Sequence, residues 1–335
     1  MPFSNLIGNE RLKLLLKRAV DENRIGQSIL MTGPRGVGKY QFAIALAQAV
    51  NCESPKQGDA CGVCLACRKI SRNEHLDVRT ILRESQDPAI KKEPKSQFIK
   101  VDQIRELSQQ AQFRPYEGRR RVFIVDDAEW LRTEAANSVL KTLEEPPETS
   151  LIILITPKPF VLLDTIRSRC LMLSFAPLIA KEIEQELLTR GVAAEEAQLR
   201  SRLANGSIGH SIEIELDEYR GARGVLLELL ETLAYSRDSI KRLNIAEYLG
   251  RKLEKDDFEK HLDALMVLLS DVFRIKLGSH VLVTNQDVLE TLERIAQRLT
   301  FDQITYLTDT IEVICLGLQR NLNRQLAMDA MLLSA

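Results

Sequence analysis

A glycine-rich loop between an apolar run and a helical pattern constrains the fold of this chain more than any other feature. The sequence GPRGVGKY spans residues 33–40, directly after the apolar run SILMT at 28–32. A strand, a glycine loop and a helix in this order are typical of a phosphate-binding loop, because glycines let backbone N–H groups converge on phosphate oxygens at a helix N-terminus. Four residues would contact the phosphates: Gly33, Gly36, Gly38 and Lys39.

The residue after the lysine departs from this pattern. A phosphate-binding loop ordinarily has Ser or Thr there, whose hydroxyl ligates Mg²⁺. This chain has Tyr40, whose phenol is too long for that place. A plain glycine turn is the alternative interpretation. We expect a nucleotide-binding-type site that is intact or vestigial, and the residues alone leave open whether ATP or ADP binds there with Mg²⁺.

Paired acids follow a second apolar run. Residues 122–125 read VFIV, and Asp126 and Asp127 come next. This is the Walker B pattern, in which the first carboxylate holds Mg²⁺ and the second polarises the attacking water. Hydrolytic versions usually carry Glu second, and Asp127 is one methylene shorter. Solvated acids at a strand end are the alternative, which the upstream glycine loop disfavours.

Four of the six cysteines lie close together in the sequence, at Cys52, Cys61, Cys64 and Cys67. Four thiolates with this spacing can close a tetrahedral metal site. Zn²⁺ is the expected metal and its role is structural, since no coordination position stays open. An iron–sulfur cluster and four unrelated thiols are the alternatives. His75 is a spare candidate ligand, and is otherwise expected to be a surface side chain.

Proline distribution divides the chain. All 11 prolines lie at or before Pro177. A helix interior rejects proline, so the remainder is expected to be a continuous set of helices, including 225–234, 258–277, 288–299 and 304–318. The first half alternates helical patterns with short apolar runs, as an α/β domain does. The expected strands are 28–32, 78–82, 122–125, 151–155 and 171–173, and 83–97 is expected to be an exposed loop.

Composition excludes several classes of protein. Lys plus Arg is 46 and Asp plus Glu is 47, so bulk positive charge does not hold this chain on nucleic acid. No apolar run approaches the ~20 residues that cross a bilayer, and the N-terminus lacks a signal sequence. We therefore expect a cytoplasmic protein with no membrane partner. The basic run 119–121 is expected to be a solvated turn.

Further motifs carry a resemblance to a known family. These are AANSVLKTLEEPP at 135–147, SRC at 168–170, FSNLIG at 3–8 and NRQLA at 323–327. With the glycine loop and the inserted cysteines, they resemble the AAA+ clamp-loader subunits of bacterial DNA polymerase III. Such subunits are components of the DNA-directed DNA polymerase holoenzyme, which replicates DNA.

The resemblance implies an architecture. Residues 1–176 would form the AAA+ domain, with a RecA-like parallel sheet and a zinc module inserted at about 52–67. Residues 177–214 would form a helical lid. Residues 215–335 would form an all-α collar through which subunits assemble.

Within this family, four departures favour the delta-prime type over the gamma/tau motor type. Tyr40 replaces the Ser or Thr, and Asp127 replaces the catalytic Glu. Gly209 stands where the family's second sensor has an arginine, and the 335-residue chain has no long tau-like extension. Such a subunit would hydrolyse no ATP itself, or very little. A gamma/tau-like active ATPase is the alternative, and a stand-alone zinc-containing DNA-binding protein is the alternative of another class.

The resemblance also assigns residues and partners. Arg169 would be an arginine finger that acts in trans on a neighbouring ATPase site, and Thr156 would complete the nucleotide-side residues. The partners would be gamma/tau and delta subunits in a hetero-oligomeric ring. The chain would act on the sliding clamp and primer–template DNA as part of that complex.

Overall fold

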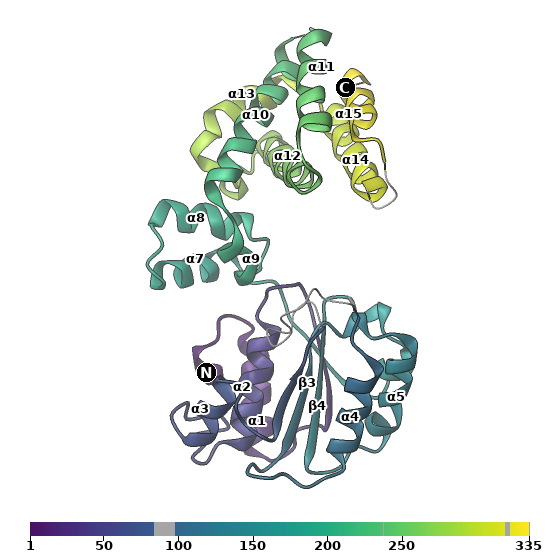
Figure 1. The fold of residues 1–335 in the computed structure, drawn as a ribbon. Coiled ribbons are helices and arrows are strands. Elements are labelled where there is room, and N and C mark those ends of the chain that lie inside the picture. The colour runs from purple at the N-terminus through teal and green to yellow at the C-terminus, as the bar shows by residue number, and fades with distance from the viewer. Residues whose placement is uncertain (84–97, 237, 319–321, 335) are drawn as a thin grey trace. The chain divides into compact units, whose positions relative to one another are not determined.

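A computed structural model describes residues 1–83, 98–236, 238–318 and 322–334. They form two compact units, shown in Figure 1. The first, here called the sheet unit, contains Met1–Arg190 and Ala204–Ile212; the second, the helical unit, contains Gly191–Leu203 and Glu213–Ala335. The predicted boundaries at 176 and 214 stay predictions, and the predicted loop 83–97 lies outside the described residues from position 84 on.

Five parallel strands form the centre of the sheet unit, in the order β2-β3-β4-β1-β5. β1 and β4 are buried at every position, as expected for a parallel sheet covered on both faces. The predicted strands agree with the observed bounds to within one residue at each end. These bounds are β1 Ser28–Thr32, β2 Val78–Ile81, β3 Arg121–Val125, β4 Ser150–Thr156 and β5 Leu171–Ser174.

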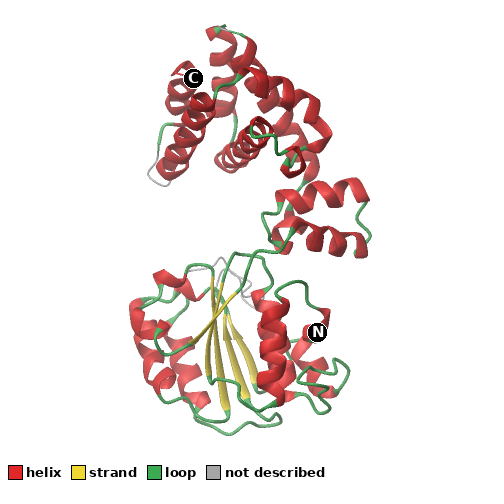
Figure 2. Ribbon diagram, turned by 180° about the vertical axis from the view of Figure 1, so that it is seen from behind, coloured by secondary structure: helices red, strands yellow, loops and turns green. Residues whose placement is uncertain are grey.

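Helices cover both faces of this sheet (Figures 1 and 2). One face carries α1 Glu10–Asp21, α2 Lys39–Asn51 and α3 Leu65–Ser71; the other carries α4 Val101–Ala111 and α5 Thr133–Glu144. The α4 and α5 side is a dense apolar core in which Ile104, Leu107 and Val139 pack with residues of β3 and β4. Shorter helices complete the unit: α6 Asp164–Arg167, α7 Ala180–Thr189 and the start of α9 Ile208–Glu213.

The helical unit is built around α12. Its buried residues Phe258, Leu262, Leu265, Leu269 and Val272 recur at helical spacing and form the middle of one large core. No helix in the described part of the chain is long and apolar enough to cross a membrane. The helices of this unit are α8 Ala194–Leu203, α10 Leu216–Tyr235, α11 Ser239–Glu247, α12 Lys255–Lys276, α13 Leu289–Arg298, α14 Phe301–Leu318 and α15 Arg324–Ser334, with a π-helical turn at Tyr248–Lys252.

A buried carboxylate joins α12 to the segment before α13. Asp271 is fully buried and accepts hydrogen bonds from the backbone N–H groups of Thr284, at 2.7 Å, and Asn285, at 2.9 Å. The amide side chain of Asn285 also donates to Asp271, and Arg223 of α10 bridges Asn285 and Asp287. These bonds compensate the cost of burying the charge, so each member of the network depends on the others.

We expect Asp271→Ala to lower the free energy of unfolding of the helical unit by about 2–4 kcal/mol, because it leaves two buried N–H groups without acceptors. Urea denaturation followed by circular dichroism measures the loss. Asp309→Ala, at an exposed position of α14, is the matched control and should stay within about 0.5 kcal/mol of the parent chain. Equal midpoints for the two variants would contradict the expectation.

Candidate nucleotide and metal sites

Parallel register brings the predicted nucleotide-side residues to one edge of the sheet. Thr32, the last residue of β1, pairs with Thr156 of β4, and Val125 of β3 pairs with Leu154. The glycine loop follows β1, and Asp126 follows β3. Since all five strands run in the same direction, these groups meet at the carboxyl edge, where ligands of open α/β sheets bind.

The glycine loop requires glycine at two close approaches. Gly33 has a φ of 135°, and a Cβ there would lie 2.5 Å from the carbonyl oxygen of Phe175. Gly36 has a φ of 68°, and a Cβ there would lie 2.2 Å from Ser207 Oγ. The loop is therefore fixed by contacts on its outer side as well as by the helix that follows it.

Lys39 is buried and bonds to the loop itself. Its Nζ donates to the carbonyl oxygens of Gly33, at 2.7 Å, and Pro34, at 2.6 Å. Burial lowers the pKa of Lys39, and the nearby carboxylates of Asp126 and Glu129 partly oppose this shift. The amino group is thus already supplied with acceptors by the loop.

Tyr40 directs its hydroxyl away from the loop. The phenol oxygen shares a hydrogen bond of 3.2 Å with Thr80 Oγ1 of β2. A Ser or Thr hydroxyl would lie one bond beyond Cβ, beside the first turn of α2. The side chain present therefore does not reproduce the magnesium ligand of a phosphate-binding loop.

The two acids after β3 lie in different surroundings. Burial raises the pKa of Asp126, and the neighbouring Asp127 raises it further, although the backbone N–H of Asp127 donates to it at 3.0 Å. Asp127 has a left-handed backbone, with a φ of 52°, and its carboxylate forms an ion pair with Arg83 at 2.8 Å. Arg35 lies 3.8 Å from its other oxygen. The carboxylate expected at the water-activating position is thus held by arginines.

Glu129 belongs to none of the sequence motifs, yet the structure places its side chain at this edge. Its side chain is only 6% exposed, accepts a hydrogen bond from Thr156 Oγ1 at 2.9 Å and pairs with Arg35 at 3.2 Å. A short 3₁₀ turn at Ala128–Trp130 brings the side chain back toward β4. A third acid in the string DDAE was the only available signal.

Residues at the start of α9 lie against the glycine loop. The backbone N–H of Gly209 donates to the carbonyl oxygen of Gly36 at 2.9 Å. A Cβ on Gly209 would lie 3.1 Å from Gly36 Cα, so even the first atom of an arginine side chain would crowd the loop. The glycine that replaces the second-sensor arginine is therefore matched to this close contact.

Arg169 lies away from the glycine loop of its own chain. Leu171, two residues later, pairs with Ile29 near the amino end of β1, roughly 10 Å of strand from the loop. Its guanidinium pairs with Glu144 at 2.7 Å and donates to the carbonyl oxygen of Thr165 at 2.9 Å. The side chain is one-third exposed at 33%, so it faces solvent while its direction is fixed.

The four clustered cysteines could bind a metal. Their sulfur atoms all lie within 4.8 Å of one another, and Cys52 and Cys64 are 4.0 Å apart. A tetrahedral site with metal–sulfur bonds of about 2.3 Å needs sulfur separations of about 3.8 Å. Backbone N–H groups of Cys61, Cys64 and Cys67 donate to the sulfurs of Cys52, Cys61 and Cys64 at 3.3–3.4 Å. The donor set therefore fits a closed thiolate site.

Electrostatic surroundings differ between the cysteines. Backbone donation, first from Val63, lowers the pKa of Cys61 to about 6. Burial instead raises the pKa of Cys170, outside the cluster, to about 12. Nearby N–H groups therefore favour the thiolate at Cys61, whereas Cys170 is held as the neutral thiol.

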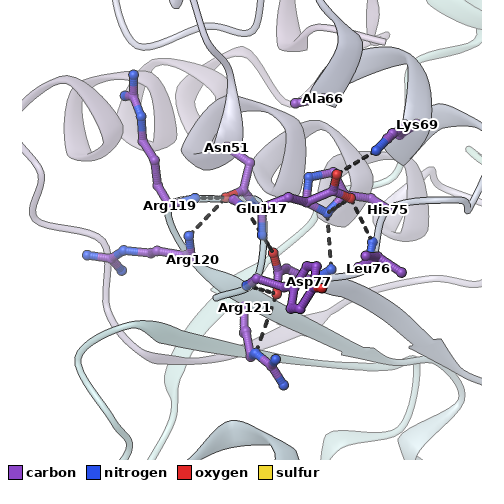
Figure 3. Close-up of polar contacts among 12 residues, drawn as sticks. Asn51, Ala66, Lys69, His75, Leu76, Asp77, Glu117, Arg119, Arg120 and Arg121 are labelled. Carbon is purple, nitrogen blue, oxygen red and sulfur yellow. Dashed lines mark hydrogen bonds and ion pairs between the residues drawn. The ribbon is translucent and has the colours of Figure 1, made fainter. Parts of the chain in front are cut away.

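The expectation that His75 is a surface side chain is wrong. It is only 4% exposed, because it packs beneath the loop at 116–120, and its Nδ1 accepts a hydrogen bond from the backbone N–H of Asp77 at 3.1 Å (Figure 3). Burial lowers its pKa, so the neutral ring is favoured. Within the described residues, the candidate metal group contains the four cysteines and not His75.

The basic run 119–121 leads from a hydrogen-bonded turn into β3 (Figure 3). Asp77 accepts hydrogen bonds from three successive backbone N–H groups at 116–118, and Asn51 accepts from those of Arg119 and Arg120. The Arg121 guanidinium lies 3.4 Å from Asp77 and donates to backbone oxygens. The backbone of Arg119 and Arg120 and the guanidinium of Arg121 thus take part in holding this segment in place.

Comparison with known proteins places the chain in a family. The family described as DNA polymerase III, delta subunit, matches residues 8–179, and the C-terminal family of the delta subunit matches residues 226–335. The chain therefore belongs to the DNA polymerase III delta subunit family.

Individual relatives show which subunit types this chain is similar to. The chain is 29% identical over 298 residues to DNA polymerase III subunit delta' of Bacillus subtilis, covering 88% of this chain and 86% of that protein. It is 33% identical over 218 residues to subunit tau of Escherichia coli, covering 63% of this chain but only 32% of tau. Among solved structures, the Bacillus subtilis clamp loader delta protein matches with 13% identity and a TM-score of 0.36, covering 95% of this chain and 98% of that one.

We expect the purified chain to hold one metal ion and Cys64→Ser to hold well below one, because three thiolates no longer close the site. Elemental analysis after dialysis measures the content. Cys170→Ser and Cys315→Ser are matched controls, since both cysteines lie outside the cluster, and both should keep the ion. Full metal in Cys64→Ser, or none in the parent chain, would disprove the assignment.

Proposed function

We propose that this chain is a delta-prime-type subunit of a DNA polymerase III clamp loader. It would assemble with gamma/tau and delta subunits in a hetero-oligomeric ring that places the sliding clamp on primer–template DNA. Family membership and the match to subunit delta' over 88% of the chain support the role. The single observation that carries the delta-prime assignment is the ion pair between Asp127 and Arg83, which holds the carboxylate that a hydrolytic subunit would use.

The remaining residues of the edge support the same conclusion. Tyr40 supplies no short hydroxyl, and Gly209 supplies no cation. The glycine loop, Lys39, Asp126 and Thr156 are proposed to be remnants of a nucleotide site. Since the hydrolytic residues do not fit together around ATP and Mg²⁺, no catalytic step is assigned to this chain's own loop.

Arg169 is proposed to act on a neighbouring subunit. The ion pair with Glu144 and the bond to Thr165 hold the guanidinium in one direction at the surface. A cation presented in this way can stabilise charge that develops on a transferred phosphoryl group in the neighbour's site. In that role the chain would promote ATP hydrolysis without carrying it out.

The metal at the four cysteines is proposed to be structural Zn²⁺. Four sulfur ligands satisfy tetrahedral Zn²⁺ and leave no position for substrate. An iron–sulfur cluster uses the same ligands, and would be seen as iron and acid-labile sulfide in the elemental analysis.

We expect the isolated chain to show ATP turnover at background level, because Asp127 is paired with arginines and Tyr40 replaces the metal-ligating hydroxyl. A coupled phosphate-release assay measures it, with a tau subunit as the positive control. Lys39→Ala should change nothing. Turnover at the rate of tau that Lys39→Ala abolishes would overturn the delta-prime assignment in favour of an active ATPase.

We expect Arg169→Ala to reduce the DNA- and clamp-stimulated ATPase rate of the rebuilt complex by the part of that rate that one ATPase site contributes. Arginine fingers acting in trans contribute roughly 10³–10⁵ in rate at the site they serve. Arg169→Lys should also be slow, because an ammonium lacks the planar fork. Arg167→Ala is the neighbouring control, since Arg167 pairs with Asp164 of its own helix.

Gel filtration of each rebuilt complex separates catalysis from assembly. An intact ring with reduced turnover supports the finger. Full turnover with Arg169→Ala would make this arginine a surface cation, and loss of the ring would make it an interface anchor.

A further inference from the structure

A buried aspartate in the cysteine-containing insertion holds the beginning of the chain. We call residues 52–67 the cysteine module and residues 1–9 the N-terminal segment. Asp59 is 8% exposed and accepts hydrogen bonds from the backbone N–H groups of Phe3, at 2.8 Å, and Ser4, at 3.0 Å. The ion pair with Lys17 of α1, at 2.8 Å, balances its charge. One carboxylate therefore joins the cysteine module, α1 and the N-terminal segment.

The position of Asp59 is fixed by a tight turn between two of the cysteines. Lys56 and Asp59 exchange two backbone hydrogen bonds of 2.9 Å. Gly58 has a φ of 71° and lies so close to α1 that a Cβ would be 1.8 Å from the carbonyl oxygen of Lys17. Cys52 and Cys61 stand at the two ends of this loop, and the backbone N–H of Cys61 donates to Cys52 Sγ at 3.3 Å. The cysteines thus close the loop that presents the aspartate.

The N-terminal segment in turn packs on the helix of the glycine loop. Phe3 is fully buried, and its ring centroid lies 6.2 Å from that of Phe42 in α2. Phe42 lies 4.8 Å from Phe175, whose carbonyl oxygen faces Gly33. At the other end of the segment, the Asn9 side chain and the backbone of Ala176 exchange hydrogen bonds of 2.9 and 3.2 Å. A contact path therefore runs from the cysteine module to the glycine loop.

A second contact joins the same elements. Gln48 of α2 is fully buried, and its Nε2 donates to the carbonyl oxygen of Cys67 at 2.7 Å. The N-terminal amino group of Met1 donates to the other end of this amide, at Gln48 Oε1. The first residues of the chain are thus bonded both to the loop of the module and, through Gln48, to its last cysteine.

We propose that the cysteine module holds the N-terminal segment in place only when metal is bound, with Asp59 as the positioning residue. Bridging the four sulfurs closes the 52–61 loop, and this closure keeps Asp59 where it meets Phe3 and Ser4. Metal occupancy then sets whether residues 1–9 stay packed on α2. The proposal rests on the metal site of the proposed function and is independent of the clamp-loader role.

Hydrogen–deuterium exchange of the full chain, read by mass spectrometry, tests whether metal binding holds the N-terminal segment. Peptides that contain residues 3–6 should exchange roughly tenfold faster after metal removal by a chelator, while those of β1 and β4 keep their protection. Asp59→Ala should give the same acceleration with one metal ion still bound, as elemental analysis shows. Asp102→Ala, an exposed acid in the first turn of α4, is the matched control and should leave residues 3–6 unchanged.

Each remaining outcome decides against the proposal. Unchanged exchange at residues 3–6 in metal-loaded Asp59→Ala would show that the carboxylate does not hold the segment. Loss of metal from Asp59→Ala would make Asp59 a support of the metal site instead. If the chelator unfolds the whole sheet unit, so that β1 and β4 also lose protection, the metal stabilises the sheet unit as a whole and not the N-terminal segment in particular. If the parent chain holds no metal, the metal assignment itself is wrong, and elemental analysis shows this independently of the exchange experiment.

Discussion

Charges at the carboxyl edge of a buried parallel sheet must be paired, and this constraint shapes the candidate site. The strands bring three partly buried carboxylates, Asp126, Asp127 and Glu129, to one edge of the sheet. Lys39 lies close enough to oppose their charge, while Arg83 and Arg35 form ion pairs with Asp127 and Glu129. An ATPase would leave such a pair of acids for Mg²⁺ and water. Here arginines of the same unit pair with Asp127 and Glu129, which is the charge balance on which the proposed absence of hydrolysis rests.

The proposed function places two different roles at the two edges of the same sheet. Parallel strands place the glycine loop at the carboxyl edge, while the turn before β5 places Arg169 toward the amino edge. The proposed absence of hydrolysis at the carboxyl edge therefore places no constraint on Arg169 at the other edge. A subunit whose site acids are paired with its own arginines can still present a fixed guanidinium to a neighbour. The proposed function depends on this separation of the two edges.

Features that depend on local sequence could be predicted, and those that depend on long-range pairing could not. Four of the strands, β1, β3, β4 and β5, contain at least three consecutive apolar residues, and the cysteine spacing is local. By contrast, α11 has only one buried residue, Ala246, so its apolar signal is weak. The Arg83–Asp127 pair joins residues from different loops, and His75 is buried by the turn at 116–120, which Asp77 and Asn51 hold. No pattern within one segment reveals such partners.

The cysteine module shows how a short insertion can gain a fixed shape. A segment of this length cannot bury a core of its own, so it needs a staple, and thiolate–metal closure is one that small modules use. Its contacts in this structure are directed inward, from Asp59 to the N-terminal segment and from Cys67, through Gln48, to Met1. Since Phe3 reaches the phenylalanines beside the glycine loop, the order of the first residues and the shape of that loop depend on the same packing. The cysteine module follows the glycine loop directly after α2, and it is connected to the loop a second time through the N-terminal segment.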